Sequence, residues 1–227
     1  MTEEKPHYLG HRERLRARFL KDMGKSFSDY ELVELLLFMA QPRGDVKPLA
    51  KALLKRFGSF AELIAADPDE IRKIAGAKDA AVTAFKVVQA AALRMARTQL
   101  IERPAIGSWR QLLDYCHSAM ARETREQFRV LYLNRKNVLI DEEVLATGTV
   151  DHTPVYPREV VKRALDLGAS ALILVHNHPS GDPTPSKGDI DMTREIQDAA
   201  GRLGIALHDH VIVGRKGHAS FKNLGLL

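Results

Sequence analysis

The chain has 227 residues, of which 45% are hydrophobic and 28% are charged. This length suits one large domain or two small ones, and the composition is that of an ordinary globular protein. The longest apolar run near the N-terminus, Leu35–Ala40, is far too short to span a bilayer, and no secretory signal is found. We therefore expect a cytoplasmic protein with no membrane partner.

The single cysteine, Cys116, limits the chemistry that the chain can perform. It excludes an internal disulfide and a thiolate zinc cluster, so a bound metal must be held by histidine and carboxylate side chains. Nothing nearby in the sequence would activate the thiol as a nucleophile, and free cysteines are usually small buried residues. We therefore expect Cys116 to lie in the core.

The net charge of +5 is unevenly distributed along the chain. Residues 1–100 contain 18 Lys+Arg and 13 Asp+Glu, whereas residues 101–227 contain 16 of each. An excess of positive charge in one part indicates a partner that carries phosphates, although a charge of this size also serves solubility alone.

Residues 1–100 have the pattern of a separate all-α module. A basic helix is predicted over 11–19, and the capping-box pattern Ser28–Glu31 begins a second helix that ends before Pro42. Shorter spacings between glycines and prolines predict further helices over 46–56, 59–65, 68–74 and 79–98.

Residues 57–88 of this module resemble the helix-hairpin-helix modules that bind the DNA backbone. Those modules present the N–H groups of a G-x-G hairpin to a phosphate, but here Gly76 is followed by Ala77-Lys78 and the second glycine is missing. Cations could still make sequence-independent contacts with DNA, and an equal alternative is that the module binds a protein or packs against its neighbour. The candidate DNA contacts are Arg12, Arg14, Arg16, Arg18, Lys73 and Lys78.

Residues 101–108 are predicted to be a linker, and residues 109–227 an α/β domain. Here the hydrophobic pattern changes to alternating strands and helices. Helices are predicted over 109–120, 157–167 and 186–203. Strands are predicted over 128–133, 138–140, 143–149, 171–175, 205–213 and 219–221, with a turn at 134–137 and full burial of the strand 171–175.

A cluster of potential metal ligands follows the buried strand. His176 and His178 are two residues apart, so in a strand both imidazoles point to one face, and Asp189 lies in the first turn of the next helix. Two histidines and a carboxylate, with water in the fourth position, form the usual open catalytic zinc site. Each part alone has a structural alternative, because H-x-H occurs again at 208–210 and Ser186 with Asp189 is also an ordinary helix cap.

Together these residues form the pattern H-x-H-P-x6-S-x-x-D, which resembles the JAMM (MPN+) metalloprotease motif without a gap or substitution. Further segments are similar to the bacterial RadC family. The resemblance covers nearly the whole chain and is strongest from about residue 122 to 225. The segments that carry it are Gly148–Asp151, Val155–Val160, His176–Ser186 and Asp209–Gly214.

The resemblance implies a cytidine-deaminase-like JAMM fold, a mixed β-sheet flanked by helices, beside the helical module. It also implies that His176, His178 and Asp189 bind one Zn2+. A glutamate just before the first core strand activates the catalytic water in JAMM enzymes, and the matching residue is Glu126. On sequence alone Glu123, Glu142 and Glu143 remain alternatives.

The motif serine, Ser186, is implied to stabilise the oxyanion. It is also placed to cap the helix, and we do not expect one hydroxyl to do both. Of the second H-x-H pair, one histidine is a candidate neighbour of the metal ligands, while a core or edge-strand position is favoured for His208. His152 and His218 carry no functional signal.

The expected function is therefore a zinc-dependent peptidase or isopeptidase that acts on a protein substrate. The alternative is a DNA repair or recombination accessory protein that binds DNA, in which the metal site is structural or vestigial. A nuclease is a weaker third interpretation, because one open zinc with one glutamate suits amide hydrolysis better than the two-metal arrangement common in nucleases.

Overall fold

The computed structural model describes residues 10–101, 104–105, 107, 109–148 and 155–227. The chain forms two compact units, Met1–Ala91 and Ala92–Leu227, and each has buried hydrophobic clusters of its own. Within the described ranges, no helix is both long enough and apolar enough to cross a membrane.

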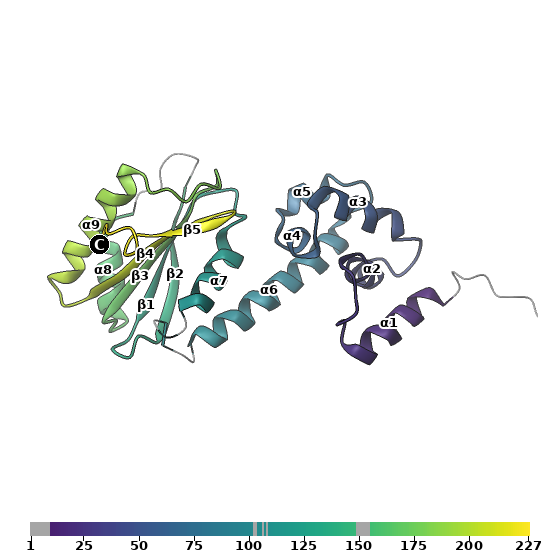
Figure 1. Cartoon of the computed structure of the whole chain (residues 1–227), viewed down its shortest axis with the longest axis horizontal. Helices are drawn as coiled ribbons and strands as arrows, with labels where there is room; N and C mark the ends of the chain where they lie inside the picture. The colour runs from purple at the N-terminus through teal and green to yellow at the C-terminus, as the bar shows by residue number, and fades with distance from the viewer. Residues whose placement is uncertain (1–9, 102–103, 106, 108, 149–154) are drawn as a thin grey trace, which may run out of the picture. The chain divides into compact units, whose positions relative to one another are not determined.

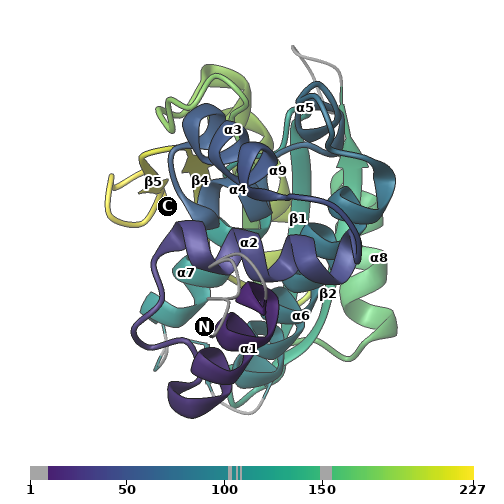
Figure 2. The same cartoon turned by 90° about the vertical axis from the view of Figure 1, so that its right-hand side faces the viewer.

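The first unit is entirely helical in its described part. Its helices lie next to one another in both views of the structure (Figures 1 and 2). The predicted start of the second helix is confirmed, since the Ser28 hydroxyl accepts from the N–H of Glu31 and the Glu31 carboxylate accepts from the N–H of Ser28. The helices are α1 (His11–Asp22), α2 (Asp29–Ala40), α3 (Lys47–Phe57), α4 (Phe60–Ala65), α5 (Pro68–Arg72) and the start of α6 (Asp79–Ile101).

The boundary between the units falls inside α6, whereas the sequence suggests residue 100. The end of α6 belongs to the second unit because Leu100 is buried in that unit's core, with Leu93 and Ala96 packed against it. In the described part of the expected linker, the N–H of Ala105 donates to the carbonyl of Asn137 at 2.6 Å. Residues 102–103, 106 and 108 of that linker lie outside the described residues.

The second unit contains a five-stranded mixed sheet in the order β2-β1-β3-β4-β5. The strand β3 lies in the middle, antiparallel to β1 and parallel to β4, while β2 and β5 form the antiparallel edges. This arrangement confirms the α/β fold class. The strands are β1 (Gln127–Leu133), β2 (Leu139–Thr147), β3 (Ala171–Asn177), β4 (Ala206–Gly214) and β5 (Gly217–Ser220).

Helices cover both faces of this sheet (Figure 1). One face packs against α7 (Trp109–Met120) and the end of α6, and the other packs against α8 (Pro157–Asp166) and α9 (Lys187–Gly201). Every residue of β3 is buried, as predicted for its continuous apolar run. Side chains at the end of β3 therefore lie at the edge of a buried core.

One prediction about the strands is wrong. The separate strands expected over 138–140 and 143–149 are one strand, β2, as far as Thr147. The acidic run between them does not break the strand, because Asp141 pairs with Arg163 at 3.0 Å and Glu142 pairs with Arg129 at 2.8 Å. Residue 149, at the predicted end, lies outside the described residues.

Candidate metal centre

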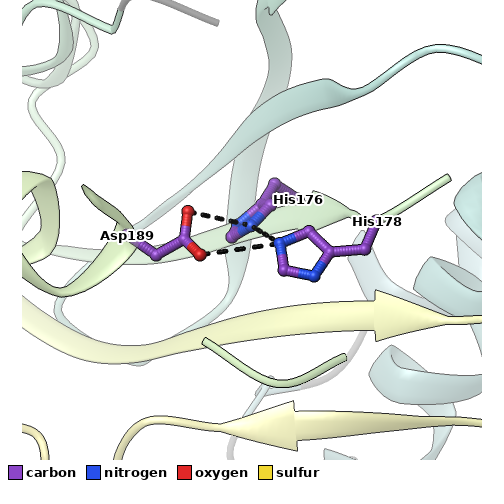
Figure 3. A group of neighbouring side chains, drawn as sticks. All are labelled: His176, His178 and Asp189. Atoms are coloured by element: carbon purple, nitrogen blue, oxygen red, sulfur yellow. Dashed lines mark hydrogen bonds and ion pairs between the residues drawn. The ribbon is translucent and has the colours of Figure 1, made fainter. Parts of the chain in front are cut away.

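Three potential ligands converge where β3 ends (Figure 3). His176 is near the end of β3, His178 follows the strand directly, and Asp189 is the third residue of α9. The Nε2 atoms of the two histidines are 2.9 Å apart. The Asp189 carboxylate faces both, with Oδ1 3.3 Å from His176 Nε2 and Oδ2 3.5 Å from His178 Nε2.

The loop after β3 is held tightly against β4. The N–H of His178 donates to the carbonyl of Val213 at 3.0 Å, and the N–H of Gly181 donates back to the carbonyl of His178 at 2.9 Å. Gly181 has a φ of 92°, which side chains disfavour, and its carbonyl lies against Gly214. A Cβ at Gly214 would lie 2.4 Å from the Gly181 oxygen, so the close approach of the loop requires glycine there.

The cap of α9 orients the carboxylate of Asp189. Ser186 Oγ accepts from the N–H of Asp189 at 3.1 Å, and Asp189 Oδ2 accepts from the N–H of Ser186 at 2.7 Å. The capping interpretation is therefore confirmed, and the cap leaves Asp189 Oδ1 facing His176. The Ser186 hydroxyl acts as an acceptor here and keeps its single proton to donate, so its two expected roles are chemically compatible.

The surroundings of the three side chains shift their pKa values in different directions. Burial lowers the pKa of His176 to about 4, so its imidazole is neutral near pH 7. The hydrogen bond with Asp189 raises the pKa of the less buried His178. Burial alone would raise the pKa of Asp189, but the hydrogen bond with His178 and the contacts with Ser186 lower it.

These residues fit a single zinc ion. With metal–ligand bonds of about 2.0–2.1 Å, neighbouring ligand atoms of a tetrahedral site are about 3.3 Å apart. Here one ligand atom from each of the three residues lies within 4.8 Å of the others, and each Nε2 has one Asp189 oxygen at 3.3 or 3.5 Å. Each histidine turns Nε2 to the centre and uses Nδ1 elsewhere, His178 against the carbonyl of Asp182 at 2.7 Å and His176 against His210 Nε2 at 2.8 Å. Two imidazoles and one carboxylate form a ligand set that zinc prefers.

Glu126 lies immediately before β1, beside the cluster. Its charge contributes to the raised pKa of His178, after the larger effect of the hydrogen bond with Asp189. The backbone around Glu126 is held by Asn177, which donates from Nδ2 to the carbonyl of Arg125 at 3.1 Å and accepts at Oδ1 from the N–H of Gln127 at 2.9 Å. The segment at the end of β3 therefore carries two of the three ligand candidates and the residue that anchors the backbone around Glu126.

Comparison with known proteins shows which family the chain resembles. The RadC-like JAB domain family matches residues 106–226. A UPF0758 protein of Rhodobacter capsulatus is 58% identical over 213 residues, which cover 94% of this chain and all of the relative. Another, from Ruegeria pomeroyi, is 55% identical over 223 residues, covering 98% and 100%. The chain belongs to the RadC family.

The matched region of this RadC family protein contains the three ligand candidates, Glu126 and Ser186. Of the segments that suggested the family, residues 149–151 lie outside the described residues, as does His152. The sequence did not predict that Asn177 anchors the backbone on either side of Glu126. Its only signal was a polar residue between His176 and His178, which in a strand points to the opposite face.

The other three glutamates considered as bases have different surroundings. Glu142 pairs with Arg129 and receives a hydrogen bond from Tyr115, and Glu143 pairs with Arg163 at 3.2 Å. Glu123 is exposed. Of the four, Glu126 is the one whose charge acts on a ligand candidate of the RadC site.

Three further histidines and the cysteine have defined positions in the second unit. His210 is fully buried beside His176. His208 donates from Nε2 to Asn137 Oδ1 at 2.6 Å, on the part of β4 that β5 does not cover. His218 is exposed in β5. Cys116 lies in the hydrophobic core, as predicted, and burial raises the pKa of its thiol to about 12.

The six candidate DNA contacts in the helical unit of the RadC protein differ in their environments. Arg12 donates to the carbonyls of Gln41, Pro42 and Gly44 at 2.7–2.9 Å, and so supports the end of α2. Two more are in ion pairs, Arg18 with Glu31 and Lys73 with Glu70. Arg14, Arg16 and Lys78 are exposed.

Proposed function

We propose that this chain is a zinc-dependent hydrolase that cleaves peptide or isopeptide bonds in a protein substrate. The observation that carries the proposal is the convergence of His176, His178 and Asp189 with Glu126 anchored beside them. Three protein ligands leave one coordination position open, which distinguishes catalytic from structural zinc sites.

His176, His178 and Asp189 would hold the ion. Bound there, zinc acts as a Lewis acid and lowers the pKa of water in the open position towards about 7. The protein's own contribution is to hold the three ligand atoms in place, through the strand end, the loop packed on Gly214 and the cap of α9.

Glu126 is proposed as the general base and acid. Its carboxylate would take a proton from the attacking water and later pass that proton to the nitrogen of the leaving amine. Such proton transfers need the carboxylate at a defined distance from the scissile bond. The two hydrogen bonds of Asn177 to the backbone on either side of Glu126 provide that restraint.

Ser186 is proposed to stabilise negative charge on the substrate's carbonyl oxygen. Because its oxygen accepts from the N–H of Asp189, the hydroxyl is held at the start of α9 with its proton free to donate. Removal of one such donor in other hydrolases costs about 100- to 1000-fold in kcat.

Amide hydrolysis is favoured over phosphodiester hydrolysis by the number of ligand groups. Nucleases commonly use two metal ions about 3.5–4 Å apart, which needs a larger set of carboxylates. In the described part of the chain, the only group of three or more converging histidine, cysteine or acidic side chains is His176, His178 and Asp189.

The test compares wild type, Glu126→Gln and a control, Glu123→Gln, which changes an exposed glutamate three residues earlier. The zinc content of each purified protein is measured first, and all three should contain about one zinc per chain, as expected for a mononuclear site. The proteins are then produced in cells that lack the wild-type chain. Newly formed protein N-termini and released amines are identified by mass spectrometry.

We expect cleavage products with wild type and Glu123→Gln and none with Glu126→Gln. The proposal fails if wild type contains no zinc, or if Glu126→Gln generates the same cleavage products as wild type.

A further inference from the structure

The imidazole of His210 is fully buried on the side of the metal centre that faces the protein interior. Its Nε2 lies 2.8 Å from Nδ1 of His176, and its Nδ1 lies 2.6 Å from the hydroxyl of Thr193 in α9. The ring of Phe221 stacks on the imidazole with 4.6 Å between ring centroids, and the ring of Phe128 lies edge-on to it with 5.6 Å between centroids. The ring is thus restrained in its plane and at both nitrogens.

The donors and acceptors in this series of hydrogen bonds permit one arrangement of the protons. The Thr193 hydroxyl donates its single proton to the carbonyl of Asp189, one helical turn earlier. Its oxygen can then only accept, so Nδ1 of His210 must carry a proton. Nε2 of His210 is left with a lone pair, which accepts from Nδ1–H of His176, and Nε2 of His176 keeps its lone pair for the centre.

The two ligand histidines therefore reach the same state by different means. His178 presents Nδ1 to the carbonyl of Asp182, which can only accept a hydrogen bond and so determines the tautomer directly. The partner of His176 is another histidine, which can accept or donate at Nε2 according to its own tautomer. The hydroxyl of Thr193 removes that ambiguity.

We propose that Thr193 and His210 are positioning residues for the metal centre. They hold His176 in the tautomer that binds metal through Nε2, and they connect α9, which carries Asp189, to the strand that carries His176. This inference rests on the proposed function, because it concerns the same zinc site. Loss of comparable outer hydrogen bonds to ligand histidines weakens metal binding by about 10- to 100-fold.

The test uses two substitutions at Thr193 in the full chain. Thr193→Val keeps the shape of the side chain and removes the hydroxyl, and Thr193→Ser keeps the hydroxyl. The zinc affinity of each protein is measured by competition with a chromophoric chelator at constant pH, and His176→Ala serves as the reference for loss of a ligand. The unfolding temperature of each metal-free protein is recorded in parallel.

We expect Thr193→Val to bind zinc about 10- to 100-fold more weakly than wild type, the loss typical of an outer hydrogen bond. Thr193→Ser should bind zinc as wild type does, although its unfolding temperature is lower because it lacks the methyl group. If Thr193 acted through packing alone, Thr193→Ser would bind zinc more weakly than Thr193→Val, because valine retains the packing and serine does not.

A second measurement reads the tautomer itself. In zinc-loaded wild type, 15N-edited NMR of the histidine rings should show the proton of His210 on Nδ1. A proton on Nε2 of His210 would overturn the relay, and this result does not depend on whether Thr193→Val folds.

The outcomes separate the two proposals. If His176→Ala loses zinc while Thr193→Val binds it as tightly as wild type, the relay is wrong and the zinc hydrolase proposal stands. If wild type binds no zinc, both are wrong.

Discussion

The two units of the chain use their charged side chains in different ways. In the helical unit, Arg12 is directed to backbone carbonyls, and Arg18 pairs with a carboxylate on a neighbouring helix. In the second unit, two imidazoles and a carboxylate converge at the end of β3 with their potential ligand atoms turned towards one another. The first pattern neutralises charge internally, whereas the second leaves a position suited to a cation.

This difference shows why net charge is a poor guide to the site. The excess of positive charge lies in residues 1–100, while the evenly balanced residues 101–227 contain the converging ligands. Composition reports totals, but binding depends on which atoms meet.

The largest effect is expected from Asp189→Asn. The substitution removes the anionic ligand but retains an oxygen that can accept from the N–H of Ser186, so the cap of α9 should persist. Zinc affinity should fall by more than about 100-fold, beyond the loss expected for an outer hydrogen bond. Chelator competition measures this change, and circular dichroism checks the helix.

The control for this variant is Asp191→Asn, an exposed position two residues further along α9. It makes the same chemical change in the same helix. If both variants lose zinc equally, the loss reflects helix charge rather than ligation by Asp189.

Gly214→Ala should disturb the second unit without touching a ligand. The added Cβ would lie 2.4 Å from the Gly181 oxygen and 3.0 Å from Pro183 Cδ, so the loop has to move. We expect a loss of about 1–3 kcal/mol in the free energy of unfolding, typical of overpacking, together with weaker zinc binding through His178. Chemical denaturation and zinc titration measure the two effects.

Gly201→Ala is the matched control, since nothing lies within 4 Å of the new Cβ and the residue ends α9. It should leave zinc binding unchanged and stabilise the helix by up to about 1 kcal/mol. Equal effects at the two glycines would show that the loop does not depend on close contact with β4.

Asn177→Ala should affect the segment that carries the proposed base, Glu126, and not the metal ligands. It removes the hydrogen bonds that anchor Arg125 and Gln127, and it leaves both ligand histidines in place. Amide hydrogen exchange should therefore become faster at Gln127, with zinc affinity close to wild type. Unchanged exchange at Gln127 would mean that Asn177 does not hold this segment.

Much of the site follows from the sequence because its ligands are close together in the chain. His176 and His178 share a strand end, and Asp189 follows after one short loop, so local geometry determines most of their arrangement. The buried strand and the capping boxes of α2 and α9 were predictable for the same reason. In each case the residues that predict the element also make the contacts that stabilise it.

The outer contacts could not be predicted because they depend on strand pairing. His208 and His210 repeat the H-x-H pattern, but the register of β4 against β3 shifts between them. Leu207 pairs with Leu172 and Asp209 pairs with the next residue, Ile173, so His208 has no partner in β3. This bulge separates the surroundings of the two histidines. His210 reaches His176 and Thr193, while His208 contacts the turn between β1 and β2.

The smallest effects are expected in the helical unit, where Arg12→Ala and Arg16→Ala distinguish folding from DNA binding. Arg12 donates to three carbonyls beyond α2 and lies over the ring of Phe38 at 4.6 Å, so its loss should destabilise α2 by about 1 kcal/mol. Arg16 is exposed, and its loss should change stability by less than about 0.5 kcal/mol. Amide exchange in α2 measures both.

If α1 binds the DNA backbone, the two variants differ again in a salt titration. Loss of one phosphate contact at Arg16 should lower the slope of log affinity against log salt by about 0.9. Arg12→Ala should leave that slope unchanged, because its guanidinium is directed to carbonyls of its own chain. An unchanged slope for Arg16→Ala, with DNA binding retained, would remove this residue from the predicted contacts and leave the exposed charge of α1 to solubility.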